Sequence, residues 1–220
     1  MKLSGAIFDM DGTLLDSMGV WAKMGSTHLR TLGFEPRGDI DSFFTSFSFR
    51  QAAEHYKYEY GVPLTVEEII KSINGAAEKK YRYEVQAKSG VPEFLQSLSE
   101  RGVTMCVATN TDKDLCKAAF TRCGIIKYFK EIITCTELSS SKKEPLIYRE
   151  CLKAMETSRE NTLVFEDALF AASTAKRDGF KLCGVYDKYE RREDELKAIS
   201  DVYLTDFTDF DGFIKAVETL

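Results

Sequence analysis

The stretch Gly5-Ala6-Ile7-Phe8-Asp9-Met10-Asp11-Gly12-Thr13 decides how the rest of the chain is interpreted. Its first four residues are small or apolar and predict a short buried strand, which two carboxylates follow at once. Open parallel α/β sheets bind ligands beyond the carboxyl ends of their strands, so Asp9 and Asp11 fall where such a sheet would hold one. Gly12 allows the backbone to turn sharply there.

Aspartates in this pattern also occur in helix caps and in calcium-binding loops. A single aspartate often caps a helix, and D-x-D-G resembles part of a calcium-binding loop. A calcium loop needs further oxygen ligands at alternating positions and a glutamate at its end, whereas Leu14 and Leu15 interrupt that pattern. The pair therefore favours a chemical site at the end of a strand.

Beyond residue 90, short β-rich runs alternate with helical patterns. After the first strand at 5–8, strands are predicted at 103–108, 131–134, 162–165, 181–185 and 202–204. Several of these runs are almost continuously apolar, as is typical of strands covered on both faces. The alternation predicts an α/β fold with a doubly wound parallel sheet.

The segment from Asp16 to Lys88 has no convincing strand and predicts successive helices. They are expected at 21–32, at 50–60, and onward from the capping box Thr65-Val66-Glu67-Glu68. We therefore expect residues 1–15 and 89–220 to form an α/β core domain. Residues 16–88 are expected to form an inserted all-helical cap domain.

Composition narrows the class of protein. The 220 residues carry a formal net charge of −5, which argues against binding to nucleic acid, because such binding needs a basic surface. No apolar run approaches the ~20 residues that cross a bilayer, and the N-terminus lacks a signal-peptide pattern. The six cysteines are scattered singly, without a C-x-x-C pair, which favours reduced thiols. We expect a cytoplasmic protein that binds neither nucleic acid nor membrane.

Four stretches in chain order resemble the motifs of the haloacid dehalogenase superfamily in its phosphatase form. They are Ile7 to Ser17, Val107-Ala108-Thr109-Asn110, Lys142 to Tyr148, and Val164-Phe165-Glu166-Asp167 with Ala171 to Gly179. Together they extend over nearly the whole chain, and the helical insertion before Gly90 matches the family's helical cap. The nearest resemblance is to β-phosphoglucomutase-like and phosphoglycolate phosphatase-like members. It implies a Rossmann-like core and a Mg²⁺-dependent phosphohydrolase acting on a small phosphorylated metabolite.

The resemblance also implies a role for each matching residue. Asp9 would be the nucleophile that carries the phosphoryl group, and Asp11 would be the general acid and base. Thr13 would position Asp11 and help to bind the phosphoryl group. Thr109, with backbone N–H groups near Asn110, would donate hydrogen bonds to the phosphoryl oxygens. A threonine after a strand is also a common helix N-cap, so that alternative stays open.

The third motif contains two adjacent lysines. Lys142 would offset the negative charge of nucleophile and phosphate, because its spacing to Pro145 and Tyr148 fits the motif; Lys143 is the alternative. The family pattern, usually K-P-x-P-D-x-F, is broken at two positions. Lys143 stands where the family has proline, and Leu146 stands where it has aspartate.

Hard oxygen ligands beside a phosphate indicate Mg²⁺, which binds one or two carboxylates and keeps several waters. The resemblance implies the Asp9 carboxylate, the Asp11 backbone carbonyl and the Asp167 carboxylate as direct ligands. Glu166 would act through a water or from just behind them. An acidic pair before a helix is also a common capping device, which is the alternative for Glu166 and Asp167.

Other conspicuous residues are interpreted as structural. His28 and His55 have no second histidine or cysteine at ligand spacing, so we expect solvated or core histidines. Trp21 and the run Phe43 to Phe49 are expected to pack the helical segment, or to line a substrate pocket. The charged run Lys188 to Lys197 predicts an exposed helix face.

Three classes of function compete. A phosphohydrolase is favoured. A phosphosugar mutase uses the same aspartyl-phosphate, but the glycine-containing cap segment of the mutases is not evident around Thr45 to Arg50. A phospho-accepting signalling module ranks last, because receiver domains are shorter and have no cap. The sequence carries no motif for the substrate or for the oligomeric state.

Overall fold

The computed structural model describes residues 1–41 and 49–220, which form two compact units. The first, here called the α/β unit, comprises Met1–Asp16 and Gln86–Leu220. The second, here called the helical unit, comprises Ser17–Val85, and the elements described in it are helices. The phenylalanine run and the segment compared with the mutases fall largely in 42–48, outside the described residues.

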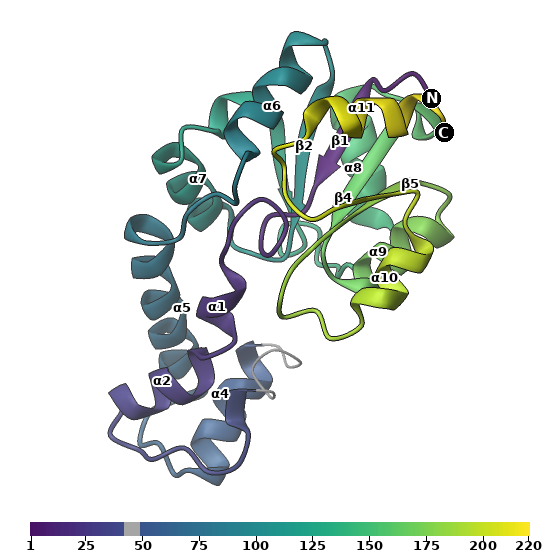
Figure 1. Cartoon of the computed structure of the whole chain (residues 1–220). Coiled ribbons are helices and arrows are strands. Elements are labelled where there is room, and N and C mark those ends of the chain that lie inside the picture. The colour runs from purple at the N-terminus through teal and green to yellow at the C-terminus, as the bar shows by residue number, and fades with distance from the viewer. Residues whose placement is uncertain (42–48) are drawn as a thin grey trace. The chain divides into compact units, whose positions relative to one another are not determined.

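The α/β unit is built on one parallel sheet of six strands (Figure 1). The strands are β1 Gly5–Phe8, β2 Thr104–Thr109, β3 Phe129–Thr134, β4 Thr162–Glu166, β5 Lys181–Val185 and β6 Val202–Leu204. They lie in the order β3-β2-β1-β4-β5-β6, and every neighbouring pair is parallel. The predicted doubly wound parallel sheet is confirmed. The strand order reverses at β1, so β1 has β2 on one side and β4 on the other.

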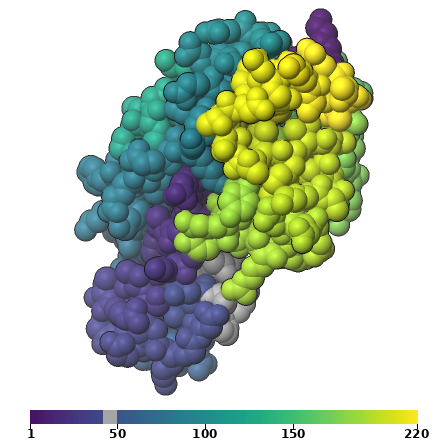
Figure 2. Space-filling model, in the orientation of Figure 1, coloured from purple at the N-terminus to yellow at the C-terminus, as the bar shows by residue number. Residues whose placement is uncertain are grey.

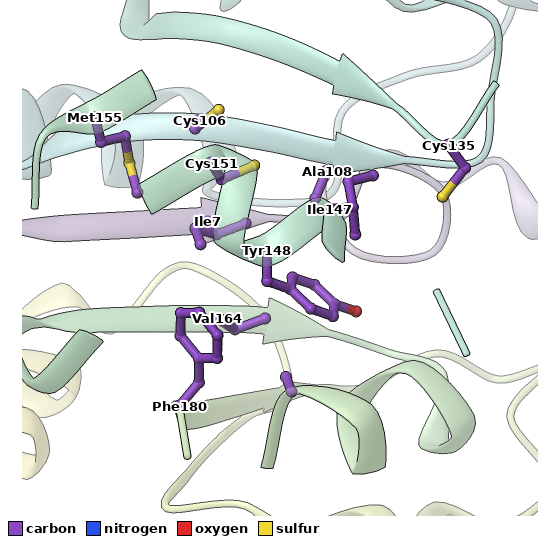
Figure 3. Packing of buried hydrophobic residues seen from close by; sticks show 11 residues of the cluster. Ile7, Cys106, Ala108, Cys135, Ile147, Tyr148, Cys151, Met155, Val164 and Phe180 are labelled. Carbon is purple, nitrogen blue, oxygen red and sulfur yellow. The ribbon is translucent and has the colours of Figure 1, made fainter. Parts of the chain in front are cut away.

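Helices cover both faces of this sheet. They are α6 Val91–Glu100, α7 Lys113–Arg122, α8 Leu146–Met155, α9 Leu169–Arg177, α10 Glu193–Ile199 and α11 Phe210–Glu218, with 3-10 turns η1 Ile126–Tyr128 and η2 Arg159–Asn161. Successive residues of β1 show the two faces. Ile7 packs with Tyr148 of α8 in a buried cluster (Figure 3), whereas Phe8 stacks on Phe165, which contacts Phe94 of α6.

The two chain ends of the α/β unit meet at its surface. The N-terminal amino group donates to the carbonyl of Val217 over 2.9 Å. Figure 2 shows the N-terminal residues in purple emerging beside α11 in yellow. Each helix of the described residues is too short or too polar to span a bilayer.

The helical unit contains α1 Met18–Trp21, α2 Met24–Thr31, α4 Phe49–Glu59 and α5 Val66–Tyr83. The predicted capping box is confirmed, because Thr65 accepts from the Glu68 amide and Glu68 accepts from the Thr65 amide. The helix predicted at 21–32 begins later than expected, because α2 starts only at Met24 and residues 22–23 separate it from α1. Gly19 lies within α1 and Gly25 within the first turn of α2, and glycine lowers helix stability by ~1 kcal/mol.

The chain leaves and re-enters the α/β unit through two adjacent segments. Leu15 and Ala87 form an antiparallel bridge. The amide of Asp16 donates to the Gln86 carbonyl over 3.0 Å, and the amide of Lys88 donates to the Leu14 carbonyl over 2.9 Å. The insertion therefore begins and ends at one place beside the end of β1.

The predicted helix face at 188–197 is wrong in its first half, because α10 begins only at Glu193. Acidic side chains bind backbone amides in the segment before it. Asp187 accepts from the Tyr189 amide and Glu190 from the Arg192 amide, over 2.9 and 2.8 Å. Such bonds compete with the helical ones and hold this segment in turns.

Candidate active site

Three carboxylates meet at the carboxyl ends of β1 and β4. Phe8 and Phe165 are paired in register, and the Asp9 amide donates to the Phe165 carbonyl over 2.9 Å. Asp9 therefore follows β1 beside the end of β4, where Glu166 and Asp167 lie. One oxygen from each of these three buried side chains lies within 4.8 Å of the others. The strand register thus joins residues that are about 160 positions apart.

Lys142 supplies the positive charge among these carboxylates. Its buried ammonium donates to Asp9 Oδ1 and, over 2.8 Å, to Glu166 Oε1. Burial alone would lower the pKa of Lys142, but the charges of Asp9 and Glu166 reverse that effect and raise it. The neighbouring Lys143 is exposed. The structure therefore brings Lys142, and not Lys143, into the cluster.

The carboxylates still carry more negative charge than Lys142 balances. Burial raises the pKa of Asp167 well above its usual range, and the charges of Asp9, Glu166 and Asp187 raise it further. Burial also raises the pKa of Glu166, although Lys142 opposes this. Asp9 Oδ2 is buried and has no hydrogen-bond partner within the described residues. An unpartnered oxygen among excess carboxylates suits a divalent cation with oxygen ligands, so the residues present fit Mg²⁺.

The hydroxyl groups expected at the site lie at the ends of β1 and β2. Buried Thr13 donates to Asp167 Oδ1 over 3.0 Å, so its described bond orients a carboxylate of the cluster. Buried Thr109 ends β2, and its hydroxyl accepts from the amide of Thr111 over 3.0 Å. Asn110 follows it with an exposed side chain.

Asp11 is half-buried and lies at the turn after β1. Gly12, next to it, has a φ of 86°, a left-handed conformation that favours glycine. The hydroxyl of Thr111 donates to Asp11 Oδ2 over 2.5 Å. The end of β2 therefore contacts the second aspartate of the first motif.

The capping alternatives are wrong for both motifs. Helix α7 is capped by Asp112, whose side chain accepts from the Asp114 amide, and not by Thr109. Helix α9 begins after Ala168, and its Leu169 amide donates to Glu190 over 2.9 Å. Because Glu190 supplies that cap, Glu166 and Asp167 remain within the cluster.

Three contributors were missed in the sequence. Thr111 contacts Asp11, and Tyr148 donates to Glu166 Oε1 over 2.8 Å. The ring of Tyr148 lies in the hydrophobic cluster drawn in Figure 3. Lys88 pairs with buried Asp187 over 3.0 Å. The first two sit within or beside the motifs, at positions where a hydroxyl could have been noticed. The third joins residues 99 positions apart and leaves no local signal.

Histidine and cysteine contribute nothing to this cluster within the described residues. His28 is buried in the helical unit against Ser72, as expected for a core histidine, and His55 is half-buried there. All six cysteines are thiols that form no disulfide. The cluster is therefore built from oxygen groups and one lysine, which suits a hard cation and an anionic substrate better than a soft metal.

Comparisons with known proteins identify the family of the chain. Residues 6–185 match the family described as haloacid dehalogenase-like hydrolase. The chain is 27% identical over 212 residues to validoxylamine A 7′-phosphate phosphatase of Streptomyces hygroscopicus subsp. limoneus, covering 93% of this chain and 94% of that protein. It is 28% identical over 221 residues to phosphoglycolate phosphatase of Rhodobacter capsulatus, covering 96% and 95%.

A solved structure shares the fold over the same length. β-Phosphoglucomutase from Clostridium difficile matches with a TM-score of 0.76 at 12% identity, covering 99% of this chain and 98% of that one. At this identity the likeness concerns the fold alone. The family match, in contrast, spans most of the chain and includes residues 6–8 of β1, the Lys142 segment and β4. The chain therefore belongs to the haloacid dehalogenase-like hydrolase family.

Proposed function

We propose that this hydrolase is a Mg²⁺-dependent phosphatase that cleaves a small phosphate monoester through an aspartyl-phosphate on Asp9. One observation carries the proposal. Asp9 is a buried carboxylate with one oxygen paired to Lys142 and the other unpartnered within the described residues, beside two more carboxylates. The phosphatase names of the two relatives above support phosphoric monoester hydrolysis as its reaction.

In the first step, Asp9 attacks the phosphorus atom, and the bond from phosphorus to the leaving oxygen breaks. Asp11 gives its proton to that oxygen, so the product leaves as a neutral alcohol. Lys142 holds Asp9 by one oxygen and offsets the charge that gathers as the phosphate approaches. Thr109 donates its hydroxyl proton to a phosphoryl oxygen.

In the second step, water attacks the phosphorus of the aspartyl-phosphate and gives a proton to Asp11. The bond from phosphorus to Asp9 breaks and returns its electron pair to the carboxylate. Inorganic phosphate leaves, and Asp11 is protonated for the next turnover. Phosphate monoesters hydrolyse very slowly without a catalyst, so dividing the reaction into two steps lowers a large barrier.

Asp9 and Asp167, with the Asp11 carbonyl, would hold Mg²⁺, and Glu166 would act through a water or from just behind them. The ion would supply positive charge that stabilises the phosphoryl oxygens. Glu166 is suited to the outer position because its Oε1 already accepts from Lys142 and Tyr148. Thr13 orients Asp167 by a hydrogen bond.

We assign the helical unit as the cap domain expected at 16–88, and the α/β unit as the core expected at 1–15 and 89–220. The cap would select the leaving group of a small phosphorylated metabolite. Reducing cytoplasmic surroundings would suit the six cysteines, none of which forms a disulfide. The mutase alternative is not favoured, because the curated relatives above are phosphatases.

The test is a screen of phosphorylated metabolites with Mg²⁺, scored by phosphate release, with Asp9→Asn as the matched control. An amide is not a competent nucleophile, so we expect Asp9→Asn to lose turnover by ~1000-fold or more. An Asp9→Asn variant that still turned over would contradict covalent catalysis. Incubation with β-glucose 1-phosphate and a trace of the bisphosphate separates the two chemistries. Glucose 6-phosphate forming faster than inorganic phosphate would make the mutase assignment correct.

A further inference from the structure

Thr111 links the ends of β1 and β2 but belongs to neither motif as matched from the sequence. It lies two residues beyond the end of β2, is half-buried, and donates its hydroxyl to Asp11 Oδ2 over 2.5 Å. The contact joins residues 100 positions apart. Only the parallel pairing of β1 and β2 brings them together, with Phe8 opposite Val107.

The backbone of Thr111 is held on both sides. Its amide donates to Thr109 Oγ1 over 3.0 Å, and the thiol of buried Cys116 donates to its carbonyl over 3.6 Å. Helix α7 starts directly afterwards, with Asp112 as its cap. The Thr111 hydroxyl is therefore presented to Asp11 from a fixed turn and not from a flexible loop.

A threonine hydroxyl suits both protonation states that the proposed mechanism requires of Asp11. A hydroxyl is both a donor and an acceptor, and its proton rotates to suit its partner. It can donate to Oδ2 when Asp11 is a carboxylate and also when the other oxygen, Oδ1, carries the proton, which leaves that proton for the leaving oxygen. It therefore fixes the direction of the carboxyl group without committing it to one state.

The same turn also directs the Thr109 hydroxyl. Since Thr109 Oγ1 accepts from the Thr111 amide, one of its lone pairs is occupied, and its proton remains to be donated elsewhere. Residues 109–111 thus present one donor for a phosphoryl oxygen and one orienting group for the acid.

We propose that Thr111 is a positioning residue that holds Asp11 in line with the leaving oxygen. This inference rests on the proposed function and deepens it. When the bond from phosphorus to the leaving oxygen breaks, the oxygen takes the electron pair and then the proton of Asp11. Asp11 becomes a carboxylate that accepts from Thr111. An Asp11 without this contact would spend less time aimed at the leaving oxygen, and the loss would grow with the basicity of that oxygen.

The experiment compares Thr111→Val, which keeps the shape, with Thr111→Ser, which keeps the hydroxyl. The probes are phenyl phosphate and 4-nitrophenyl phosphate, which differ mainly in the basicity of the leaving oxygen. We expect Thr111→Val to lower kcat/KM for phenyl phosphate by roughly 10- to 100-fold, the range for a hydrogen bond to a charged group. The nitrophenyl ester needs little protonation, so its kcat/KM should fall by only about threefold. Thr111→Ser should restore both.

Loss of the contact between Thr111 and Asp11 should also slow the second step of the reaction and so lower kcat. Asp11 must also take a proton from the attacking water, so Thr111→Val should accumulate phosphorylated protein with the nitrophenyl ester, visible by intact-mass measurement. Thr121→Val is the matched control, because Thr121 is an exposed threonine in the last turn of α7, and it should behave as wild type. Thr111→Ala serves as a second deletion of the hydroxyl if valine disturbs folding.

The outcomes distinguish a failure of the positioning role of Thr111 from a failure of the proposed function. Equal losses of kcat/KM on both esters, or a Thr111→Ser variant as impaired as Thr111→Val, would overturn the positioning role alone. A wild-type protein that hydrolyses neither ester would overturn the proposed function, and this inference with it.

Discussion

The contact between Asp9 and Lys142 distinguishes Lys142 from the lysine next to it in the chain. Lys142 and Lys143 are adjacent and chemically identical, but Lys142 is buried between Asp9 and Glu166 while Lys143 is exposed. A buried lysine needs paired carboxylates, and buried carboxylates need a cation. Each group in the cluster is thus tolerated because of the others.

A matched pair of substitutions tests this difference. Lys142→Met should lower the free energy of unfolding by about 3 to 5 kcal/mol, because breaking a buried pair leaves uncompensated charge. Lys143→Met, at an exposed position, should change it by less than about 0.5 kcal/mol. Urea denaturation followed by circular dichroism measures both. Similar effects of the two substitutions would contradict the burial described for Lys142.

At the residue scale, the sequence located side chains better than it located their partners. Asp9, Lys142, Glu166 and Asp167 were picked out by spacing and resemblance, and they lie in one cluster. The bonds from Thr13 to Asp167 and from Thr111 to Asp11 were not predicted, because a hydroxyl's partner depends on which strands pair. Sequence spacing carries no information on that pairing.

At the scale of elements, glycines and caps mark where helices begin and end. Gly102, Gly124 and Gly179 each have a positive φ just beyond the end of a helix, as is typical of glycine at a helix C-terminus. Predictions of helix ends from the local sequence failed where the capping residue was distant in sequence or where helix propensity was weak. Glu190 caps α9 from 21 residues away, and the helix expected from Trp21 begins only at Met24.

Two glycines that flank α6 allow a test at this scale. Gly90 and Gly102 have φ angles of 78° and 74°, so alanine at either would be strained. A Cβ at Gly90 would also lie 2.5 Å from the Phe207 carbonyl carbon, whereas a Cβ at Gly102 would meet nothing within 4 Å. Gly102→Ala should cost about 1 kcal/mol of unfolding free energy, and Gly90→Ala about 3 kcal/mol. Urea unfolding of both variants checks this, and equal costs would refute the close approach.

His28 gives the helical unit a dependence on pH. It is buried, its Nε2 shares a hydrogen bond of 2.9 Å with Ser72 Oγ, and its ring stacks on Tyr56. Burial lowers the pKa of His28 below 6.5, so the ring binds a proton less readily in the folded unit than in the unfolded chain. The unfolded state then binds more protons as the pH falls below about 6.5, and stability is lost in that direction.

The prediction is a pH-dependent difference between wild type and His28→Gln. Between about pH 7.5 and pH 5.5, wild type should lose up to ~1 kcal/mol more unfolding free energy than His28→Gln. The only tryptophan, Trp21, reports on this unit, because its indole N–H donates to Tyr81 over 2.7 Å. Fluorescence during urea unfolding therefore gives the comparison. Parallel pH profiles for the two proteins would exclude His28 as the source.

At the scale of the whole molecule, the fold was more predictable than the site. Buried apolar runs alternating with helices define a doubly wound sheet, because each strand needs cover on both faces. The strand order brings β1 between β2 and β4, and this order creates the cluster from residues far apart in sequence. The substrate could not be predicted from the sequence, since no motif marks the residues that would select it.

The excess carboxylate charge leads to a prediction for the whole enzyme. Activity on 4-nitrophenyl phosphate should require Mg²⁺ and disappear with excess chelator. Mg²⁺ at 100 times its dissociation constant should add about 2.7 kcal/mol to the stability of wild type. Asp167→Asn should reduce that gain, because it removes a ligand charge. Thermal unfolding with and without the ion measures the gain, and full activity in excess chelator would refute the metal assignment.

The antiparallel contact between Leu15 and Ala87 has a consequence for how the chain can change in evolution. Directly opposed residues of antiparallel strands lie only about 5 Å apart, so a tight turn of two residues could join the segments that flank the helical unit. Because its two ends lie so close together, a segment inserted here imposes little constraint on the α/β unit. It can be lengthened, exchanged for another module or removed without altering the sheet order. Under the proposed role of the helical unit as a cap, recombination at this junction would let one set of carboxylates serve many different leaving groups.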